Sequence, residues 1–358
     1  MKVQSSAPGK LFLAGEYAVV EAGNPALIAA IDQSITVTIE TSTEGRIYSD
    51  QQKETVFWDR VGHQIQVVAG HPYKLIVTAL RQVEAYVQQQ GVETTGIFSV
   101  MIETELDHIE TGVKYGLGSS GAVTVATVQA LLAFYGQVVD PYLVYQLSVL
   151  TQLQLGMTGS FGDLAASSYG GVVAYRSVDR GWLQDAIQHY LLRDLLRLSW
   201  KGLSIQTVSL PTDLTLSIGW TGSAASTEKL VKQAGYHSDQ DGKAAYYPVF
   251  LQESRQCVAA LVKACVDNQC EEFQKGIQRN RELLGKFAAV MGLVIETPTL
   301  TELCNIALEE SAVAKSSGAG GGDCGICFVT SSKQQGIIYE KWQEKGILPL
   351  PFSIAPEK

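Results

Sequence analysis

The sequence lacks the features that mark several protein classes. Of its 358 residues, 27 are Lys or Arg and 36 are Asp or Glu, and a net charge near −9 excludes a general attraction to nucleic acid or anionic lipid. No uncharged apolar run reaches the ~18 residues that a membrane span requires. No apolar segment resembling a secretory signal follows the first residues. We therefore expect a soluble, cytoplasmic protein with neither a nucleic-acid nor a membrane partner.

Cysteine and histidine are sparse, and neither is arranged as a metal site. All six cysteines lie in the last third of the chain, where a protein without an export signal has no need of disulfides. Cys324 and Cys327 form a C-x-x-C pattern inside an apolar run that predicts a strand. On a strand, an offset of three turns two side chains to opposite faces. The five histidines are isolated, and no zinc site is expected.

The order of predicted elements favours an α+β fold. Apolar periodicity predicts strands at residues 10–20, 26–40, 97–103, 171–176 and 215–220. It predicts helices at residues 73–90, 119–135, 141–155, 182–198, 247–268, 271–291, 299–314 and 333–345. Strands and helices do not alternate regularly, as they would in a doubly wound sheet. The length predicts two domains, which we place at residues 1–205 and 206–358.

Glycine is abundant, with 34 residues, and the first glycine-rich segment suits a phosphate group. Gly116, Gly118 and Gly121 satisfy G-x-G-x-x-G, but the preceding strand ends near Glu103, too early for a dinucleotide-binding motif. Glycines allow close approach of the backbone to phosphate, and a helix starting near residue 119 presents unpaired N–H groups. Two serines follow there, more than a helix cap needs. A Walker-type G-x-x-x-x-G-K-[ST] motif is absent.

Other segments carry charged or hydroxyl side chains in unusual places. Lys10 and Glu16 interrupt an apolar run near the start, which indicates either an edge position or a pocket lysine. Asp163 begins a short helical stretch, either as a helix cap or as a functional carboxylate. The turn at 221–227 is rich in hydroxyl groups, and a second glycine-rich segment at 317–322 is either the wall of a site or a mobile linker.

In this order the segments resemble the motifs of the GHMP kinase family. The three motifs match residues 8–17, 116–122 and 317–322, and they are most similar to those of bacterial phosphomevalonate kinases. The resemblance implies an N-terminal domain like the second domain of ribosomal protein S5, a ferredoxin-like C-terminal domain and an active site in the cleft between them. It implies ATP and Mg²⁺ as co-substrate and metal, and phosphorylation of 5-phosphomevalonate to 5-diphosphomevalonate. Mevalonate kinase, mevalonate diphosphate decarboxylase and a non-catalytic ATP-binding sensor are the alternatives.

The resemblance also implies roles for individual residues. Lys10 and Asp163 match the catalytic pair, and Ser120 the Mg²⁺ ligand. Counting back eleven residues from Asp163 gives Gln152, where mevalonate kinases carry a metal-binding carboxylate. The nucleotide is expected to bind Lys114, Gly116, Leu117, Gly118, Ser119, Ser120 and Gly121. The substrate is expected to bind Lys10, Tyr17, Ser160, Ser223, Ser226, Lys315, Gly320 and Gly321.

Repulsion between the acceptor phosphate and the phosphates of ATP determines which roles these residues must fill. The second pKa of a phosphomonoester is about 6, so its oxygen is already anionic at neutral pH and a general base contributes little. Two unit charges about 4 Å apart repel by roughly 4 kcal/mol at an effective dielectric constant near 20. We therefore assign Lys10 to the transferred phosphoryl group, Lys114 to bridging the phosphates, and Asp163 to orienting Lys10 or the metal. The protein is expected to be a monomer or a homodimer acting on small molecules.

Overall fold

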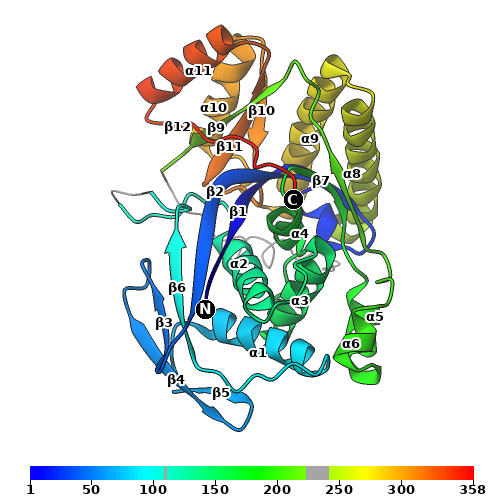
Figure 1. Cartoon of the computed structure of the whole chain (residues 1–358). Coiled ribbons are helices and arrows are strands. Elements are labelled where there is room, and N and C mark those ends of the chain that lie inside the picture. Colours follow the sequence, from blue (N-terminus) through cyan, green and yellow to red (C-terminus); the bar gives the residue numbers. More distant parts are fainter. Residues whose placement is uncertain (109–110, 223–241) are drawn as a thin grey trace.

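Two antiparallel-rich sheets organise the chain, as Figure 1 shows for this computed structural model, which describes residues 1–108, 111–222 and 242–358. The first sheet has the order β5-β4-β3-β6-β2-β7-β8, and β1 pairs with β2 outside this path. Its strands are β1 (Lys2–Ala14), β2 (Pro25–Thr41), β3 (Gly45–Ser49), β4 (Thr55–Val61), β5 (Gln64–Val67), β6 (Phe98–Thr104), β7 (Val172–Arg176) and β8 (Ser204–Val208). The short helix η1 (Ala18–Val20) follows β1.

Helices cover this sheet and bury its apolar face. They are α1 (Lys74–Gln88), α2 (Ser119–Phe134), α3 (Pro141–Gln154) and α4 (Gly162–Tyr169), followed by α5 (Arg180–His189) and α6 (Leu192–Leu195). Helix α2 is apolar on all sides because it lies inside the layer, against β1, β2, α1 and α3. Asp140 caps α3 by accepting a hydrogen bond from the Leu143 N–H, and Pro141 occupies the first turn, where no N–H is needed.

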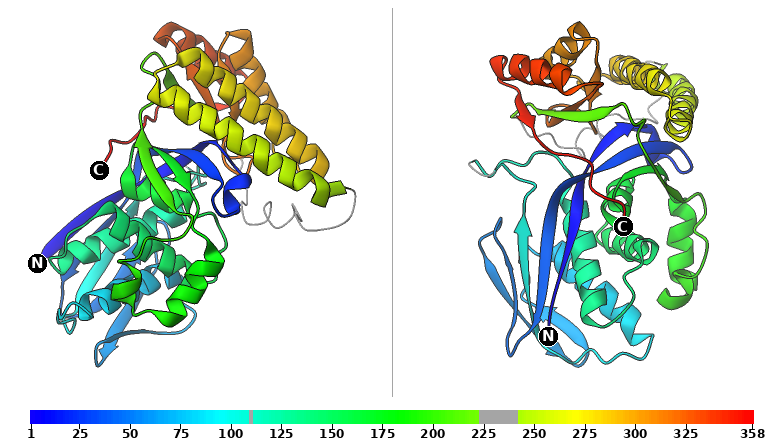
Figure 2. Two further views of the ribbon diagram at one scale, coloured as in Figure 1. Left: turned by 90° about the vertical axis from the view of Figure 1, so that its right-hand side faces the viewer. Right: turned by 45° about the horizontal axis from the view of Figure 1, so that its top comes forward.

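The second sheet has the order β10-β11-β9-β12 and is covered by helices (Figure 2). Its elements run β9 (Thr215–Trp220), α8 (Lys243–Val266), α9 (Cys270–Met291), α10 (Pro298–Glu309), β10 (Val313–Ser316), β11 (Cys324–Val329), α11 (Ser332–Glu344) and β12 (Leu348–Leu350). If α8, α9 and α10 are counted as one helical connection, the elements follow the β-α-β-β-α-β succession of ferredoxin-like folds. This agrees with the α+β prediction and with the expected C-terminal architecture.

The chain passes from the first sheet to the second between Val208 and Thr215, and the boundary proposed after residue 205 falls inside β8. It then returns, because the Ala355 N–H donates to the Ala30 carbonyl at 2.9 Å and the Lys358 N–H to the Tyr169 carbonyl at 2.9 Å. Figure 1 shows the C-terminus beside β7 and α4. The last residues therefore tie the end of the chain to the first sheet.

Several predicted elements differ from the structure. The helix predicted at 182–198 is two helices, α5 and α6, because Tyr190 and Leu191 are extended. The helix predicted at 299–314 ends at Glu309, and Ser311, at φ 60°, turns the chain into β10. The β3–β5 hairpins were not predicted. In β4 alternate side chains are exposed, but two of them, Phe57 and Val61, are apolar, so the sequence does not alternate between polar and apolar residues.

The cysteine prediction is confirmed. All six thiols are free, and Cys324 and Cys327 belong to different apolar clusters on the two faces of β11. Within the described residues no cluster of His, Cys, Asp or Glu is suited to a metal ion. The same part of the chain contains no helix with the length and apolarity of a membrane span.

Candidate active site

The outer edge of β1 collects the predicted motifs. Among the described strands β1 pairs only with β2, so every second residue directs a backbone group away from the sheet. The Pro8 carbonyl accepts from Ser167 Oγ of α4 at 2.7 Å, the Lys10 N–H donates to the Leu117 carbonyl at 2.8 Å, and the Phe12 carbonyl accepts from Ser317 Oγ at 3.0 Å. Three segments far apart in sequence thus meet along five residues of one strand.

The side chains of Lys10 and Asp163 lie together under the first glycine-rich segment. A Cβ atom on Gly118 would lie 3.0 Å from Cε of Lys10, and one on Gly121 would lie 2.6 Å from Oδ2 of Asp163. The half-buried Lys10 ammonium lies 5.5 Å from the centre of the Phe12 ring, and no described carboxylate forms an ion pair with it. The structure therefore brings the predicted catalytic pair together and leaves the charge of Lys10 available to an anion.

The N-terminus of α2 opens beside this pair. The residue before the helix is Gly118, at φ 80°, and no side chain caps the helix. Neither Ser119 nor Ser120 is therefore a conventional cap, and Ser120 is exposed. Unpaired N–H groups and the positive end of the helix dipole attract an anion, and Gly118 and Gly121 allow the Lys10 and Asp163 side chains to lie against this end of the helix. This geometry suits the phosphates of a nucleotide.

Asp163 occupies the first turn of α4. Burial raises the pKa of its carboxyl group, while the charge of Lys10 and hydrogen bonds from the N–H groups of Leu164 and Asp163 itself lower it. Burial is the largest of these effects. A carboxylate held in this way binds a neighbouring cation strongly, because ionisation without a partner is unfavourable there.

The residues present fit a magnesium ion held with the help of phosphates. Mg²⁺ prefers oxygen ligands, and it is usually bound through one or two carboxylates together with substrate phosphates. The Ser120 hydroxyl and the Asp163 carboxylate both lie at the N-terminus of α2. Gln152 is buried on α3 with its Nε2 unpaired, and an amide in this position supplies no negative charge. The donor set is thus smaller than one built on two carboxylates.

The second glycine-rich segment closes over the first. A Cβ atom on Gly116 would lie 2.3 Å from Cγ of Asp323, and the thiol of Cys324 donates to the Tyr115 carbonyl at 3.1 Å. Gly320 abuts the backbone of residue 295, where a Cβ atom would lie 2.2 Å from the Ile295 carbonyl oxygen. Glycine is required at Gly116 by the close approach of the Asp323 side chain and at Gly320 by that of the Ile295 backbone, so the second segment packs tightly around the first.

Two residues predicted to bind substrate, Tyr17 and Gly321, make hydrogen bonds that hold this segment in place. The Tyr17 hydroxyl donates to the Ala319 carbonyl at 2.6 Å, and its ring packs 4.9 Å from that of Phe287. Gly321 donates its N–H to the Ile295 carbonyl at 2.8 Å. Tyr17 therefore supports the second glycine-rich segment at Ala319, and Gly321 ties that segment to Ile295.

Lys315 is a correction to the sequence analysis. Its side chain is completely buried and its ammonium is paired with Glu16 and the Ser316 carbonyl, so it does not face a substrate. This buried ion pair links β10 to the turn after β1. The signal was present in the sequence, because Glu16 and Lys315 are charges of opposite sign in two apolar segments.

The remaining predicted residues are scattered. Lys114 is exposed and lies opposite Asp107 in a short bridge between two strand-like segments. Leu117 is buried, and its carbonyl accepts a hydrogen bond from the Lys10 backbone N–H. Ser160 is half-buried two residues before α4, where its hydroxyl accepts from the Gly162 N–H at 3.3 Å. Ser223 and Ser226 lie outside the described residues.

Two family models match this chain. The one described as GHMP kinases N terminal domain matches residues 74–171, and the one described as GHMP kinases C terminal matches residues 261–348. A phosphomevalonate kinase of Streptomyces sp. (strain CL190) is 36% identical over an alignment that covers 98% of this chain and 96% of that protein. The chain belongs to the GHMP kinase family.

Solved structures agree with this assignment. A Lin0012 protein from Listeria innocua superposes with a TM-score of 0.93 at 33% identity, covering 100% of this chain and 99% of that one. A Streptococcus pneumoniae phosphomevalonate kinase in complex with phosphomevalonate and AMPPNP superposes with a TM-score of 0.85 at 32% identity, covering 99% of each chain. The GHMP kinase fold and family predicted from the three motifs are confirmed.

We predict that Gly121→Ala lowers activity without unfolding the protein. Alanine favours the helix by about 1 kcal/mol, but its methyl group would displace the Asp163 carboxylate. A loss of roughly tenfold to a hundredfold in kcat is expected, since small misplacements have effects of this size. The control is Gly285→Ala on α9, where a Cβ atom meets nothing within 4 Å. Equal activity of the two variants would contradict the proximity of Gly121 to a functional carboxylate.

We predict that Lys315→Met destabilises the protein by about 3–5 kcal/mol, because it leaves the buried Glu16 carboxylate without a partner. Denaturant unfolding measures this loss. The double variant with Glu16→Gln should recover most of it. Lys345→Met, which removes an exposed pair with Glu302, should cost less than about 1 kcal/mol. Additive losses in the double variant would show that the two charges do not stabilise each other.

Proposed function

We propose that the protein transfers the γ-phosphoryl group of ATP to 5-phosphomevalonate, with ADP and 5-diphosphomevalonate as products. The observation that carries the proposal is the Lys10 ammonium, which forms no ion pair with any described carboxylate, beside the N-terminus of α2, whose N-cap residue is Gly118. Together they gather positive charge where two phosphate groups must meet. The 36% identity to a phosphomevalonate kinase over almost the whole chain supports the choice of acceptor. The partners are small molecules, and a monomer or a homodimer is the predicted state.

The two phosphate groups need distinct partners. The phosphates of ATP fit the glycine-rich turn and the α2 N–H groups, next to the Lys10 and Asp163 side chains that pack against Gly118 and Gly121. The acceptor phosphate approaches from the side of Lys10 and Ser160. Lys10 then lies between donor and acceptor, where its charge offsets their repulsion and the negative charge of the transition state. Lys114, which is exposed at the rim, is proposed to reach the nucleotide phosphates.

Ser120 and Asp163 would hold Mg²⁺, which when bound neutralises and orients phosphate oxygens. Because the acceptor is already ionised at neutral pH, Asp163 has no proton to remove. Its role is to fix the ammonium of Lys10 and to supply a metal ligand. Catalysis then consists of positioning and charge stabilisation, as is usual in phosphoryl transfer.

A mevalonate kinase is the second candidate. The observation in its favour is the half-buried Asp163 carboxyl, whose raised pKa moves it toward the range of a general base for an alcohol. The measurement that separates the candidates is ADP release with Mg-ATP and mevalonate, 5-phosphomevalonate or 5-diphosphomevalonate offered separately. We expect turnover with 5-phosphomevalonate alone. Turnover with mevalonate alone would make Asp163 a base, and CO₂ release from 5-diphosphomevalonate would indicate a decarboxylase.

Asp163→Asn should be milder than Lys10→Met. We expect the Asn variant to lose less than about a thousandfold in kcat, since removal of a true general base costs about 10²–10⁴-fold. Lys10→Met should lower kcat severely. If Lys10→Met raised KM alone, Lys10 would bind ground and transition states equally and the assignment would fail.

Thermal unfolding is the fold control for Asp163→Asn. Because burial raises the pKa of Asp163, its ionised form costs stability at pH values above that raised pKa. The Asn variant should therefore be at least as stable as the parent at pH 7.5. The difference should shrink as the pH falls toward the ordinary value of 3.8.

A further inference from the structure

The segment before α4 adopts an unfavourable backbone conformation. Phe161, at φ 62° and ψ 12°, is in the left-handed region, although its large side chain is only 1% exposed. Such a conformation persists only where the surroundings enforce it, and Asp163 follows two residues later. The question is which groups fix this turn.

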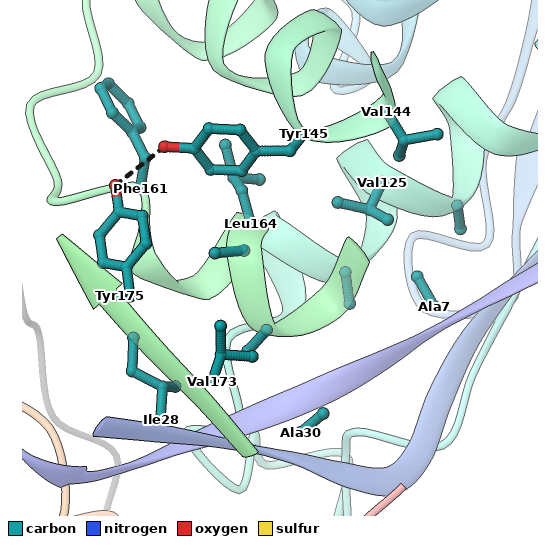
Figure 3. Packing of buried hydrophobic residues seen from close by; sticks show 14 of the residues in the cluster. Ala7, Ile28, Ala30, Val125, Val144, Tyr145, Phe161, Leu164, Val173 and Tyr175 are labelled. Atoms are coloured by element: carbon teal, nitrogen blue, oxygen red, sulfur yellow. Dashed lines mark hydrogen bonds between the residues drawn. The ribbon is translucent and has the colours of Figure 1, made fainter. Parts of the chain in front are cut away.

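Two buried tyrosines, hydrogen-bonded to each other, contact the backbone of this turn through one hydroxyl. The Tyr175 hydroxyl donates to the Ser160 carbonyl at 2.7 Å and lies 2.9 Å from the Tyr145 hydroxyl, as Figure 3 shows for the two rings. Since the single proton of Tyr175 is used on the carbonyl, Tyr145 must donate to Tyr175. Burial raises the pKa of both phenols, so both remain protonated donors at neutral pH. The pair forms a one-way chain that ends on one backbone oxygen.

Arg180 fixes the same turn from another side. Its guanidinium lies 4.6 Å from the centre of the Phe161 ring, and one of its N–H groups donates to the Thr158 carbonyl at 2.9 Å. Gly162 packs directly against Ile28, because a Cβ atom at this position would lie 2.6 Å from Cδ1 of Ile28. Three independent contacts therefore act on residues 158–162, all of them on backbone or on Phe161.

We propose that Tyr175, Tyr145 and Arg180 are positioning residues that hold residues 158–163 in this turn and thereby set the place of Ser160 and Asp163 relative to Lys10. The kinetic part of this inference rests on the proposed function. Ser160 is anchored through its carbonyl, which turns its hydroxyl toward the N-terminus of α4, and the strained Phe161 directs the helix so that Asp163 lies under Gly121. Errors of about 1 Å in such a position cost up to a hundredfold in rate.

Tyr175→Phe is the decisive variant, because it removes one oxygen and keeps the ring in the core. We expect kcat/KM for 5-phosphomevalonate to fall at least tenfold, with KM for ATP changed by less than twofold. Tyr145→Phe should have a smaller effect, because Tyr175 still reaches Ser160. Arg180→Lys should retain more activity than Arg180→Met, since a cation over the Phe161 ring is preserved. The control is Tyr339→Phe on α11, a tyrosine packed against Trp342 in the second sheet's core, which should match the parent enzyme.

Amide hydrogen exchange of the peptide covering residues 156–170 tests the positioning without any substrate. Faster exchange in Tyr175→Phe than in Tyr339→Phe supports the proposal even if the parent enzyme proves to use another acceptor. Unchanged exchange overturns the proposal. Parent-like kcat/KM in Tyr175→Phe, with a loss of Tm equal to that of Tyr339→Phe, also overturns it, because the hydroxyl would then be only structural.

Discussion

The unpaired edge of β1 is the constraint on which the site depends. A strand that pairs on one side must satisfy its other backbone groups elsewhere, and here hydroxyl and carbonyl groups from α4, the α2 turn and the β10–β11 segment do so. Proline at position 8 fits this edge, since only its carbonyl is needed there. Because the contacts are backbone groups spaced two residues apart, the strand fixes the distances between three motifs from different parts of the chain.

Two lysines near the site, Lys10 on β1 and Lys315 on β10, have different electrostatic surroundings. Glu16 and Lys315 are buried as a pair, which joins the two sheets and neutralises both charges. Lys10 instead forms no ion pair with a described carboxylate, and its side chain packs against Gly118. A paired buried charge contributes to the fold, whereas an ammonium held without an ion pair in a confined place attracts an anionic ligand. The protein therefore separates its structural lysine from its functional one.

The turn at residues 158–163 adds a second constraint, since it places a carboxylate where burial disfavours ionisation. The tyrosines and Arg180 act only on its backbone and on Phe161. Their contacts come from α3, β7 and α5, so the position of Asp163 reflects the packing of the whole helical layer. These contacts explain why Asp163 has a defined position although its helix, α4, is only eight residues long.

Apolar periodicity and glycine spacing are local properties, so the fold class, most helices and the glycine-rich segments could be predicted from the sequence. The roles of Lys10 and Asp163 came from the resemblance to the GHMP kinase motifs, and the structure brings both side chains to Gly118 and Gly121. The pairing of Lys315 with Glu16, the support of a loop by Tyr17 and the bond of Tyr175 to the Ser160 carbonyl could be seen only in the folded chain. A buried charge or hydroxyl takes whichever partner the packing supplies, and that partner can be distant in sequence, as the separations of 299 for Glu16 and Lys315 and 302 for Tyr17 and Ala319 show.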